Sequence, residues 1–492
     1  MASIFLQVLA LLAILYILQE LHNQFIKKKK KLPPGPKGLP IIGNLHMIGK
    51  NIHQDLHKIA KKYGPIMSMK FGAIPIIVAS SPHAAEQFLK KHDLIFASRP
   101  NSRVMQIVAY NQRNLTFGKY GPYWRNMRKL CTLELLSPLK INSFQDMRKQ
   151  QVTNFVTLIN QAASSHVEVD ISANLALLSA NMSCLMIFGK KYMDDEFDER
   201  GFKDVIQEAL IIAATPNIDK FDLQGLIPRM KKLAKVFDEF LERVIDEHAQ
   251  NSKEEKQTKD IVDTMMNIMQ SGEAEFEFDR RHVKAILLDL LIASIDTSAT
   301  SIDWIFSELL RHPNIMKKLQ KELEQVVGMN RMVEESDLEK LEYLDMIIKE
   351  GFRLHPIAPL LIPRESMEDC IIDGFNIPRG SRILVNTWAI GRDSEVWPEP
   401  EKFMPERFVG SDIDLRGHDF QLLPFSSGRR RCPGLQLGLT VVRLVIAQLV
   451  HCFDWKLPND MMPNDLDMTE KFSLVVSRAQ HLMAIPTYRL HV

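Results

Sequence analysis

The chain has 492 residues, of which 46% are hydrophobic and 25% charged, so it can bury a large core and is neither disordered nor a coiled coil. Its 62 basic and 60 acidic side chains give a formal charge of +2, which argues against a nucleic-acid binder dominated by phosphate contacts. The five cysteines form no CxxC pair, so they suggest neither a disulfide framework nor a zinc knuckle, and a reducing compartment fits them best.

The N-terminus has the composition of a membrane anchor. Residues 1–18 are nearly all apolar, and the lysine cluster Lys27–Lys31 follows them. A helix of about 20 residues spans the ~30 Å hydrocarbon layer, and this run is near the short end of that range. The alternative is a cleaved signal peptide, but such a peptide carries its basic cluster before the apolar run. We expect an uncleaved single-pass anchor over 1–26, a basic and proline-rich hinge over 27–40, and one cytosolic domain over 41–492.

Two tripeptides match the N-glycosylation pattern. They are Asn114-Leu-Thr and Asn181-Met-Ser. Such tripeptides are common by chance, and a cytosolic domain would leave both unmodified.

The first elements of the soluble part are a hairpin and a helix. Two short apolar runs, Ile66–Phe71 and Ile74–Ala79, are separated by Gly72-Ala73 and predict a β-hairpin. Ser81-Pro82 then starts a helix that runs to about His92.

The rest of the chain is predicted to be mainly helical. Most of residues 120–350 indicate long amphipathic helices, with segment 251–259 as an exposed loop. Segment 370–386 predicts strands around an Asp-Gly turn, and 391–428 has no helical periodicity. A final helix is expected over 434–450. The fold class is therefore mainly α with a minor β part, in one large domain.

The segment Phe425-Ser-Ser-Gly428-Arg-Arg430-Arg-Cys432-Pro-Gly434 has the composition of a site that holds a thiolate. The two glycines allow a positive φ and a close approach of the backbone. Proline suits the first turn of a helix, whose positive dipole end would lie beside the sulfur and lower the thiol pKa. Arg430 can reach a buried carboxylate. The alternative is a buried structural cysteine.

Two helical segments also carry residues that suggest a site. Glu350 and Arg353 are three residues apart and share a helix face, in a helix whose capping box, Ser336-Asp-Leu-Glu339, predicts its start. Taken alone, that pair is a solvated salt bridge. An apolar helix over 285–310 ends before Pro313 and places four residues on one face. These are Asp289, Ala293, Asp296 and Thr297. The alternative to a functional site is that an aspartate of this helix only caps it or bonds to its backbone.

The cysteine segment resembles the haem-binding signature FxxGxRxCxG of the cytochrome P-450 superfamily, with every fixed position filled. Other segments resemble the family's motifs in the same order, and together they span essentially the whole chain. These are the anchor, the Pro-Pro-Gly-Pro hinge, Trp124-Arg-Asn-Met-Arg128, the acid–alcohol pair Asp296-Thr297, Glu350-Gly-Phe-Arg353, Pro405-Glu-Arg407-Phe408 and the cysteine loop. The opening and the cysteine loop look like those of plant microsomal members of the A-type group.

The resemblance implies a P-450 fold, preceded by one transmembrane helix, that binds haem b through the thiolate of Cys432. The residues that match the family's haem-propionate contacts are Arg430, Trp124, Arg128 and Arg364. Taken singly, Trp124 is equally well an ordinary core tryptophan, and Arg128 and Arg364 are equally well ordinary surface arginines. Asp296 and Thr297 match the pair that relays protons during oxygen activation.

Two further positions bear on the family pattern. Arg407 is the expected third member of a buried cluster with Glu350 and Arg353, which would fix the loop behind the cysteine because such clusters seldom add net stability. Ser294 stands where the family usually has glycine. Its hydroxyl can bond back to the i−4 carbonyl and bend the helix. This departure leaves two outcomes open: the enzyme inserts oxygen into its substrate, or it couples or desaturates the substrate.

The resemblance also implies an enzyme of the endoplasmic reticulum membrane, with its catalytic domain on the cytosolic face. Since the chain lacks a flavin or nicotinamide fingerprint, electrons are expected from an NADPH-dependent flavoprotein reductase. That partner would dock on cationic side chains which, taken alone, are ordinary solvated residues. They are Arg125, Lys129, Arg429 and Arg431.

The substrate is expected to be hydrophobic, because the segments that match the family's recognition regions are mostly apolar. They are 102–119, 211–221, 289–293, 357–362 and 472–475. Asp289 could pair with a basic nitrogen. The chain resembles plant members that oxidise monoterpene indole alkaloids by cyclisation or aromatisation, and hydroxylation of a terpenoid or phenolic is the alternative. A reductase-independent rearranging enzyme and a non-catalytic membrane scaffold are the rival classes.

Overall fold

The computed structural model describes residues 31–192, 202–215, 222, 225–250, 259–272 and 276–491. The predicted anchor, and the predicted loop over 251–259 except for Lys259, lie outside the described residues.

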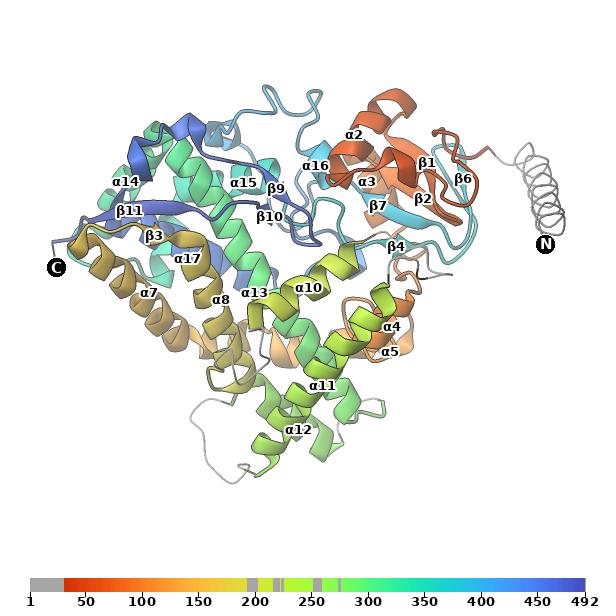
Figure 1. Cartoon of the computed structure of the whole chain (residues 1–492), viewed down its shortest axis with the longest axis horizontal. Helices are drawn as coiled ribbons and strands as arrows, with labels where there is room; N and C mark the ends of the chain where they lie inside the picture. Colours follow the sequence, from red (N-terminus) through yellow and green to blue (C-terminus); the bar gives the residue numbers. More distant parts are fainter. Residues whose placement is uncertain are drawn as a thin grey trace, which may run out of the picture.

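Helices form most of the described chain, and the longest of them, α13, runs through its middle (Figure 1). α13 (Arg280–Arg311) begins at a capping box formed by Asp279 and His282, and Pro313 starts the next helix. It packs against α8 (Ile171–Phe188) and α17 (Leu435–Cys452). The other helices are α2 (Ile52–Tyr63), α3 (Pro82–Glu86), α4 (Arg103–Val108), α5 (Pro122–Leu130), α6 (Pro138–Ser143), α7 (Gln145–Ser165), α10 (Phe202–Ala214), α11 (Leu226–Gln250), α12 (Ile261–Ser271), α14 (Pro313–Val327), α15 (Glu342–Leu354) and α16 (Thr387–Ile390).

Short turns of other helix types occur close to the segments predicted to be functional. The π-helical turns η2 (Gln87–Lys91) and η3 (Cys131–Leu135) extend α3 and α5. The 3₁₀ turns η5 (Pro405–Phe408) and η6 (Gly428–Arg430) interrupt the long segment without helical periodicity. The remaining 3₁₀ turns are η1 (Leu45–Met47), η4 (Glu335–Lys340), η7 (Pro458–Asp460) and η8 (Pro463–Asp465).

The strands within the described residues form four small sheets. The largest has the order β1-β2-β7-β4 and contains the predicted hairpin, β1 (Ile66–Phe71) and β2 (Ile74–Ala79), which is paired antiparallel. β2 also pairs in parallel with β7 (Arg382–Val385), which pairs antiparallel with β4 (Arg364–Glu365). The other sheets join β5 (Cys370–Ile372) with β6 (Phe375–Ile377), β9 (Glu470–Lys471) with β10 (Ser477–Arg478), and β11 (Met483–Tyr488) with both β3 (Val169–Asp170) and β8 (Phe453–Lys456).

Most predicted elements are confirmed, and one helix start is wrong. The hairpin has the predicted bounds, and the Ser81 side chain caps the helix that follows it. However, the segment at Ser336 is the 3₁₀ turn η4, and α15 begins only at Glu342. The capping box of η4 is formed by Glu334 and Asp337, and the predicted pair, Ser336 and Glu339, lies inside this short turn.

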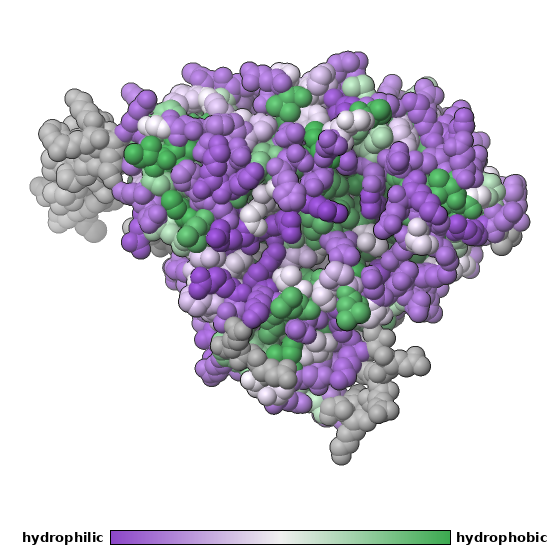
Figure 2. All heavy atoms as spheres, turned by 180° about the vertical axis from the view of Figure 1, so that it is seen from behind, coloured by the Kyte–Doolittle hydropathy of each residue, from purple (hydrophilic) through white to green (hydrophobic). Residues whose placement is uncertain are grey.

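Apolar residues gather inside the fold. Three described helices, α8, α13 and α17, are long and apolar enough to cross a membrane, but more than half of the apolar stretch of each is buried within the protein. Figure 2 shows a largely hydrophilic face with separate small hydrophobic groups. We therefore interpret these three helices as core helices that position the site.

Candidate active site

The cysteine loop, Phe425–Gly434, turns sharply just before α17. The Cys432 amide donates to the Phe425 carbonyl at 2.9 Å, which closes the loop. Gly428 has a φ of +68°, and an added Cβ there would lie 2.6 Å from a carboxylate oxygen of Asp93. Only glycine fits at this position, because both the backbone angle and the close neighbour exclude a side chain.

The Cys432 side chain lies beside the N-terminal end of α17, and the Gly434 amide donates to its sulfur. Burial nevertheless raises the pKa of this thiol above its ordinary value, while the Gly434 amide and the nearby Arg128 and Arg431 act in the opposite direction. The expected net lowering of the thiol pKa is therefore wrong for the protein alone. In the protein alone, desolvation of the sulfur outweighs the Gly434 amide and the two arginines.

The predicted Glu–Arg–Arg cluster is present, with Glu350 and Arg353 buried and Arg407 at its edge. Arg353 donates to both carboxylate oxygens of Glu350, at 2.7 and 2.9 Å, and Arg407 donates to the same carboxylate at 3.0 Å. Phe352, next to Arg353 on α15, packs edge-on against Phe425 of the cysteine loop with ring centroids 5.5 Å apart. The cluster is thus connected to the base of the loop.

The expected acid–alcohol pair lies on α13. The Thr297 hydroxyl donates to the Ala293 carbonyl at 2.7 Å, one turn earlier, and Asp296 is half-buried beside it. Ser294 donates to the Leu291 carbonyl at 3.3 Å, which is an i−3 bond and not the expected i−4 bond. The helix continues through this stretch, so the serine in place of glycine does not interrupt it.

Asp289 joins α13 to the loop before α5. Its carboxylate accepts hydrogen bonds from Asn114 Nδ2 at 2.7 Å and from the Thr116 amide at 2.8 Å. Burial raises the pKa of Asp289 to about 6, although these hydrogen bonds act to lower it. The carboxylate is therefore a link between two segments and is not directed at a ligand.

The sequence pattern of the family described as Cytochrome P450 matches residues 33–483. The chain belongs to the cytochrome P450 family. Cytochrome P450 CYP736A12 of Panax ginseng is 51% identical to this P450 over 478 residues, which cover 94% of this chain and 95% of the relative. Norfluorocurarine oxidase of a Strychnos species is 40% identical and covers 95% and 94% of the two chains. Flavonoid 3'-monooxygenase CYP75B137 of Crocosmia x crocosmiiflora is 38% identical and covers 99% and 98%.

P450 enzymes carry haem b and receive electrons from NADPH through a reductase, and the residues of this P450 fit that cofactor. Arg99, Arg364 and Arg430 are all buried. Burial and neighbouring guanidinium groups lower the pKa of Arg430 to about 9, and they also lower the pKa of Arg99. Grouped buried cations are unfavourable unless anions neutralise them, and the two haem carboxylates have the right charge.

The predicted propionate contacts Trp124 and Arg128, on α5, lie against the cysteine loop that carries Arg430. The Arg430 guanidinium stacks on the Trp124 ring, 3.8 Å from its centroid, and Arg128 donates to the Arg431 carbonyl at 2.7 Å. The indole N–H of Trp124 donates to the Leu115 carbonyl at 2.9 Å. In this arrangement Trp124 therefore supports Arg430 by stacking, and its only donor is already engaged.

Arg99 and Asp93 belong to this region but were missed by the sequence analysis. Arg99 donates to the Thr116 carbonyl at 3.0 Å and to the Pro363 carbonyl at 2.9 Å, so it joins two segments around the site. Asp93 accepts from Arg364 at 2.9 Å. One signal was available: Asp93 follows a helix end, where the dipole disfavours an acid that has no cationic partner.

A cavity of about 190 Å³ lies among the segments expected to recognise the substrate. Four of the five segments contribute to its wall, through Ser102, Val104, Met105, Phe117, Ile212–Thr215, Ala358–Ile362 and Phe472–Leu474. The fifth segment, 289–293, does not. The wall is mostly apolar, as predicted, and the one acid among its described residues, Glu470, is bonded to His53 and Gln54.

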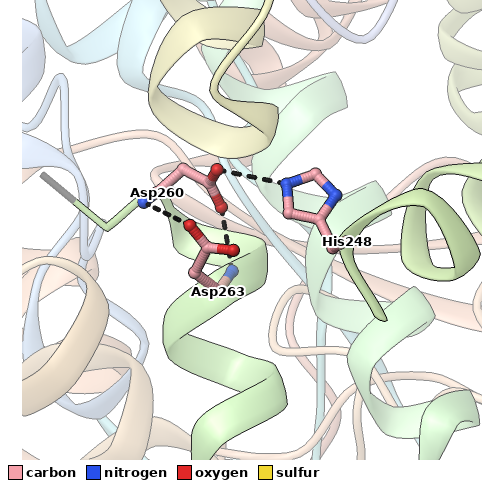
Figure 3. A group of neighbouring side chains, drawn as sticks. All are labelled: His248, Asp260 and Asp263. Carbon is pink, nitrogen blue, oxygen red and sulfur yellow. Dashed lines mark hydrogen bonds and ion pairs between the residues drawn. The ribbon is translucent and has the colours of Figure 1, made fainter. Parts of the chain in front are cut away.

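A second group of possible metal ligands lies far along the chain from the cysteine loop, where His248, Asp260 and Asp263 have ligand atoms within 4.8 Å of one another (Figure 3). The His248 ring bonds to Asp260 at 3.1 Å, and the two aspartates form the capping box of α12. These contacts join the end of α11 to the start of α12. They account for the group without a metal ion.

Proposed function

We propose that this P450 is a membrane-anchored haem-thiolate monooxygenase that uses O2 and NADPH to oxidise a hydrophobic plant specialised metabolite. The observation that carries the proposal is the cysteine loop. Its closed backbone directs the Gly434 amide at the Cys432 sulfur, and buried Arg364 and Arg430 lie close to it in the fold. A structural cysteine would need none of these neighbours.

The residues that would hold the cofactor follow from this arrangement. Cys432 would coordinate the iron, Arg430, Arg128 and Arg364 would bind the propionates, and Trp124 would support Arg430. When bound, thiolate-ligated haem activates molecular oxygen, because electron donation from sulfur favours cleavage of the O–O bond.

Thr297 and Asp296 would supply protons to this reaction. The bond to the Ala293 carbonyl fixes the Thr297 side chain, so its Oγ1 can accept a hydrogen bond from a water molecule and hold that water as the proton donor. Asp296, the neighbouring acid, would restore that proton from solvent. Ser294 leaves the helix that carries both residues continuous.

The substrate is proposed to be hydrophobic and uncharged. Oxidative cyclisation or aromatisation of a monoterpene indole alkaloid fits the similarity to norfluorocurarine oxidase, but a basic alkaloid nitrogen would need a free carboxylate. Asp289 and Glu470 are both engaged in bonds within the protein. That observation favours the alternative, hydroxylation of a terpenoid or phenolic substrate, which the similarity to a flavonoid 3'-monooxygenase also supports.

The proposed electron donor is an NADPH-dependent flavoprotein reductase in the same endoplasmic reticulum membrane. Arg125 and Lys129 are exposed on α5, and Arg431 is exposed on the cysteine loop. The bond from Arg128 to the Arg431 carbonyl brings these two elements together, so the cations lie on one side. Such a patch would attract an acidic partner surface close to the cysteine.

The direct test of this proposal is Cys432→Ala. The haem-replete wild-type protein, reduced and treated with carbon monoxide, should give the Soret band of a thiolate-ligated haem. The variant should lose that band and all NADPH-dependent oxidation, because no other described side chain is placed to replace the sulfur. Cys131→Ala, at a buried cysteine on η3, is the matched control and should keep the band. A thiolate band in the Cys432 variant would contradict the proposal.

A further inference from the structure

Asp93 occupies an unusual position for an acid. It is 6% exposed and follows the π-helical turn η2, at a helix end whose dipole disfavours a negative charge. A buried carboxylate in such a place requires strong partners. Its partners belong to the cysteine loop and to β4, both far away in the sequence.

The first partner is Arg429, in the middle of the cysteine loop. Asp93 Oδ2 accepts from the Arg429 amide at 3.1 Å and from the Arg429 guanidinium at 2.8 Å. The preceding residue is Gly428, where an added Cβ would collide with Asp93 Oδ1. The carboxylate therefore fixes the turn η6, which begins four residues before Cys432.

The second partner is Arg364, one of the three buried arginines. Asp93 Oδ1 accepts from Arg364 Nη1 at 2.9 Å, while Arg364 Nη2 donates to the Ser427 carbonyl at 2.7 Å. The guanidinium thus lies between the acid and the loop. Its plane is set by these two bonds, so its orientation depends on Asp93.

We propose that Asp93 is a positioning residue that sets both the geometry of the cysteine loop and the electrostatic potential at the cofactor. This inference rests on the proposed haem-thiolate site. Two consequences follow from the bonds of Asp93. Its hydrogen bonds hold the loop in the shape in which the Cys432 sulfur would coordinate the iron, and its charge offsets part of the positive charge of Arg364 and Arg430.

The charge and the geometry can be separated with two substitutions in the holoenzyme. Asp93→Asn removes the charge at constant size, so the midpoint potential of the haem should become more positive, because a more positive surrounding favours the reduced iron. The affinity for haem should also fall about tenfold, as expected for loss of an outer-shell partner. Asp93→Glu keeps the charge, so the potential should stay near the wild-type value while the fraction of thiolate-ligated haem decreases.

The measurements are a redox titration, the carbon monoxide difference spectrum and the rate of haem transfer to apomyoglobin. Asp303→Asn is the matched control, because Asp303 is also buried and pairs with a buried arginine, Arg478, at 3.6 Å. It should leave the potential unchanged. An equal potential in Asp93→Asn and wild type, or an equal shift in the Asp303 control, would overturn the inference.

Two other outcomes also test the inference. If Asp93→Asn fails to bind haem while Asp93→Glu binds haem at the wild-type potential, the inference is supported. If both variants lose haem, Asp93 acts in folding alone and the inference is overturned. A wild-type protein that lacks the thiolate band would instead contradict the proposed function, so the two failures are distinguishable.

Discussion

Thr297 is the residue whose proposed role depends most on a single bond. Its hydroxyl is held by the Ala293 carbonyl, and Thr297→Ala removes that hydroxyl without disturbing the helix, since alanine is a good helix former. We expect the variant to keep the thiolate spectrum but to release reduced oxygen as hydrogen peroxide. The yield of product per NADPH consumed should fall by about tenfold, since a positioned proton donor contributes at least that much.

Ser301 provides the matched control for this measurement. Its hydroxyl donates to the Thr297 carbonyl at 2.8 Å, so it makes the same kind of bond one turn later, at a buried position. Ser301→Ala should leave the coupling of NADPH to product unchanged. If Thr297→Ala retains wild-type coupling, the proton-relay role is wrong.

Single residues were predictable where one short segment carries the signal. Cys432 with its glycines, and Glu350 with Arg353, are such cases. Asp93 and Arg99 were not predictable because their function arises from long-range contacts: Asp93 and Arg364 are 271 positions apart. The thiol pKa was predicted in the wrong direction for a related reason, since the sequence indicates the helix end but not the degree of burial.

Between elements, the bond of Asp289 to the loop before α5 makes a prediction about pH. The folded pKa of Asp289 is about 6 and its ordinary value is 3.8, so the folded protein holds this proton more tightly than the unfolded chain. The contribution of this bound proton to the free energy of unfolding is complete below the ordinary pKa, and it is lost as the pH rises through the folded pKa. Between about pH 5 and pH 7.5 the loss is about 1 kcal/mol.

Asp289→Asn removes this titration. Relative to wild type, the free energy of unfolding of the variant should therefore improve by about 1 kcal/mol between about pH 5 and pH 7.5, whatever its absolute value. Thermal unfolding of both proteins, followed by circular dichroism across this pH range, measures the difference. Parallel pH profiles would mean that Asp289 does not titrate in this range.

Helices and strands were predicted best where a periodic run is bounded by turn residues, as in β1 and β2. The start of α15 was misplaced because a capping box satisfies the first amides of any helix type, including the 3₁₀ turn η4. The parallel pairing of β2 with β7, which aligns Ile76 with Arg382, could not be predicted. Local patterns do not specify which distant strands meet.

For the whole molecule, the described part begins at Lys31, inside the hinge predicted over 27–40. The Lys31 carbonyl accepts a hydrogen bond from the Asn376 amide at 2.7 Å, and its ammonium group lies over the Phe375 ring, so this residue belongs to the folded part. Deletion of residues 1–30 should therefore release the protein from membranes and preserve haem binding. Sedimentation after a high-salt wash, with the full-length protein fractionated in parallel, measures the release.

A deleted protein that still sediments with the membrane would show that a second surface inserts, and the region around Ile211 is the first to test. A deleted protein that is soluble but lacks haem would mean that the N-terminal segment is needed for folding. Either result would contradict the expected independence of anchor and catalytic domain.

The bond between Asn114 and Asp289 has one further consequence, for the biogenesis of the enzyme. Asn114 is the acceptor of a glycosylation tripeptide, yet its side-chain nitrogen, the atom that a sugar would occupy, is buried and engaged. A glycan could be attached only to a chain that had entered the lumen before folding, and that chain could not then close this contact. Sugar on Asn114 would therefore mark molecules inserted in the reverse orientation, which makes this residue an intrinsic reporter of topology.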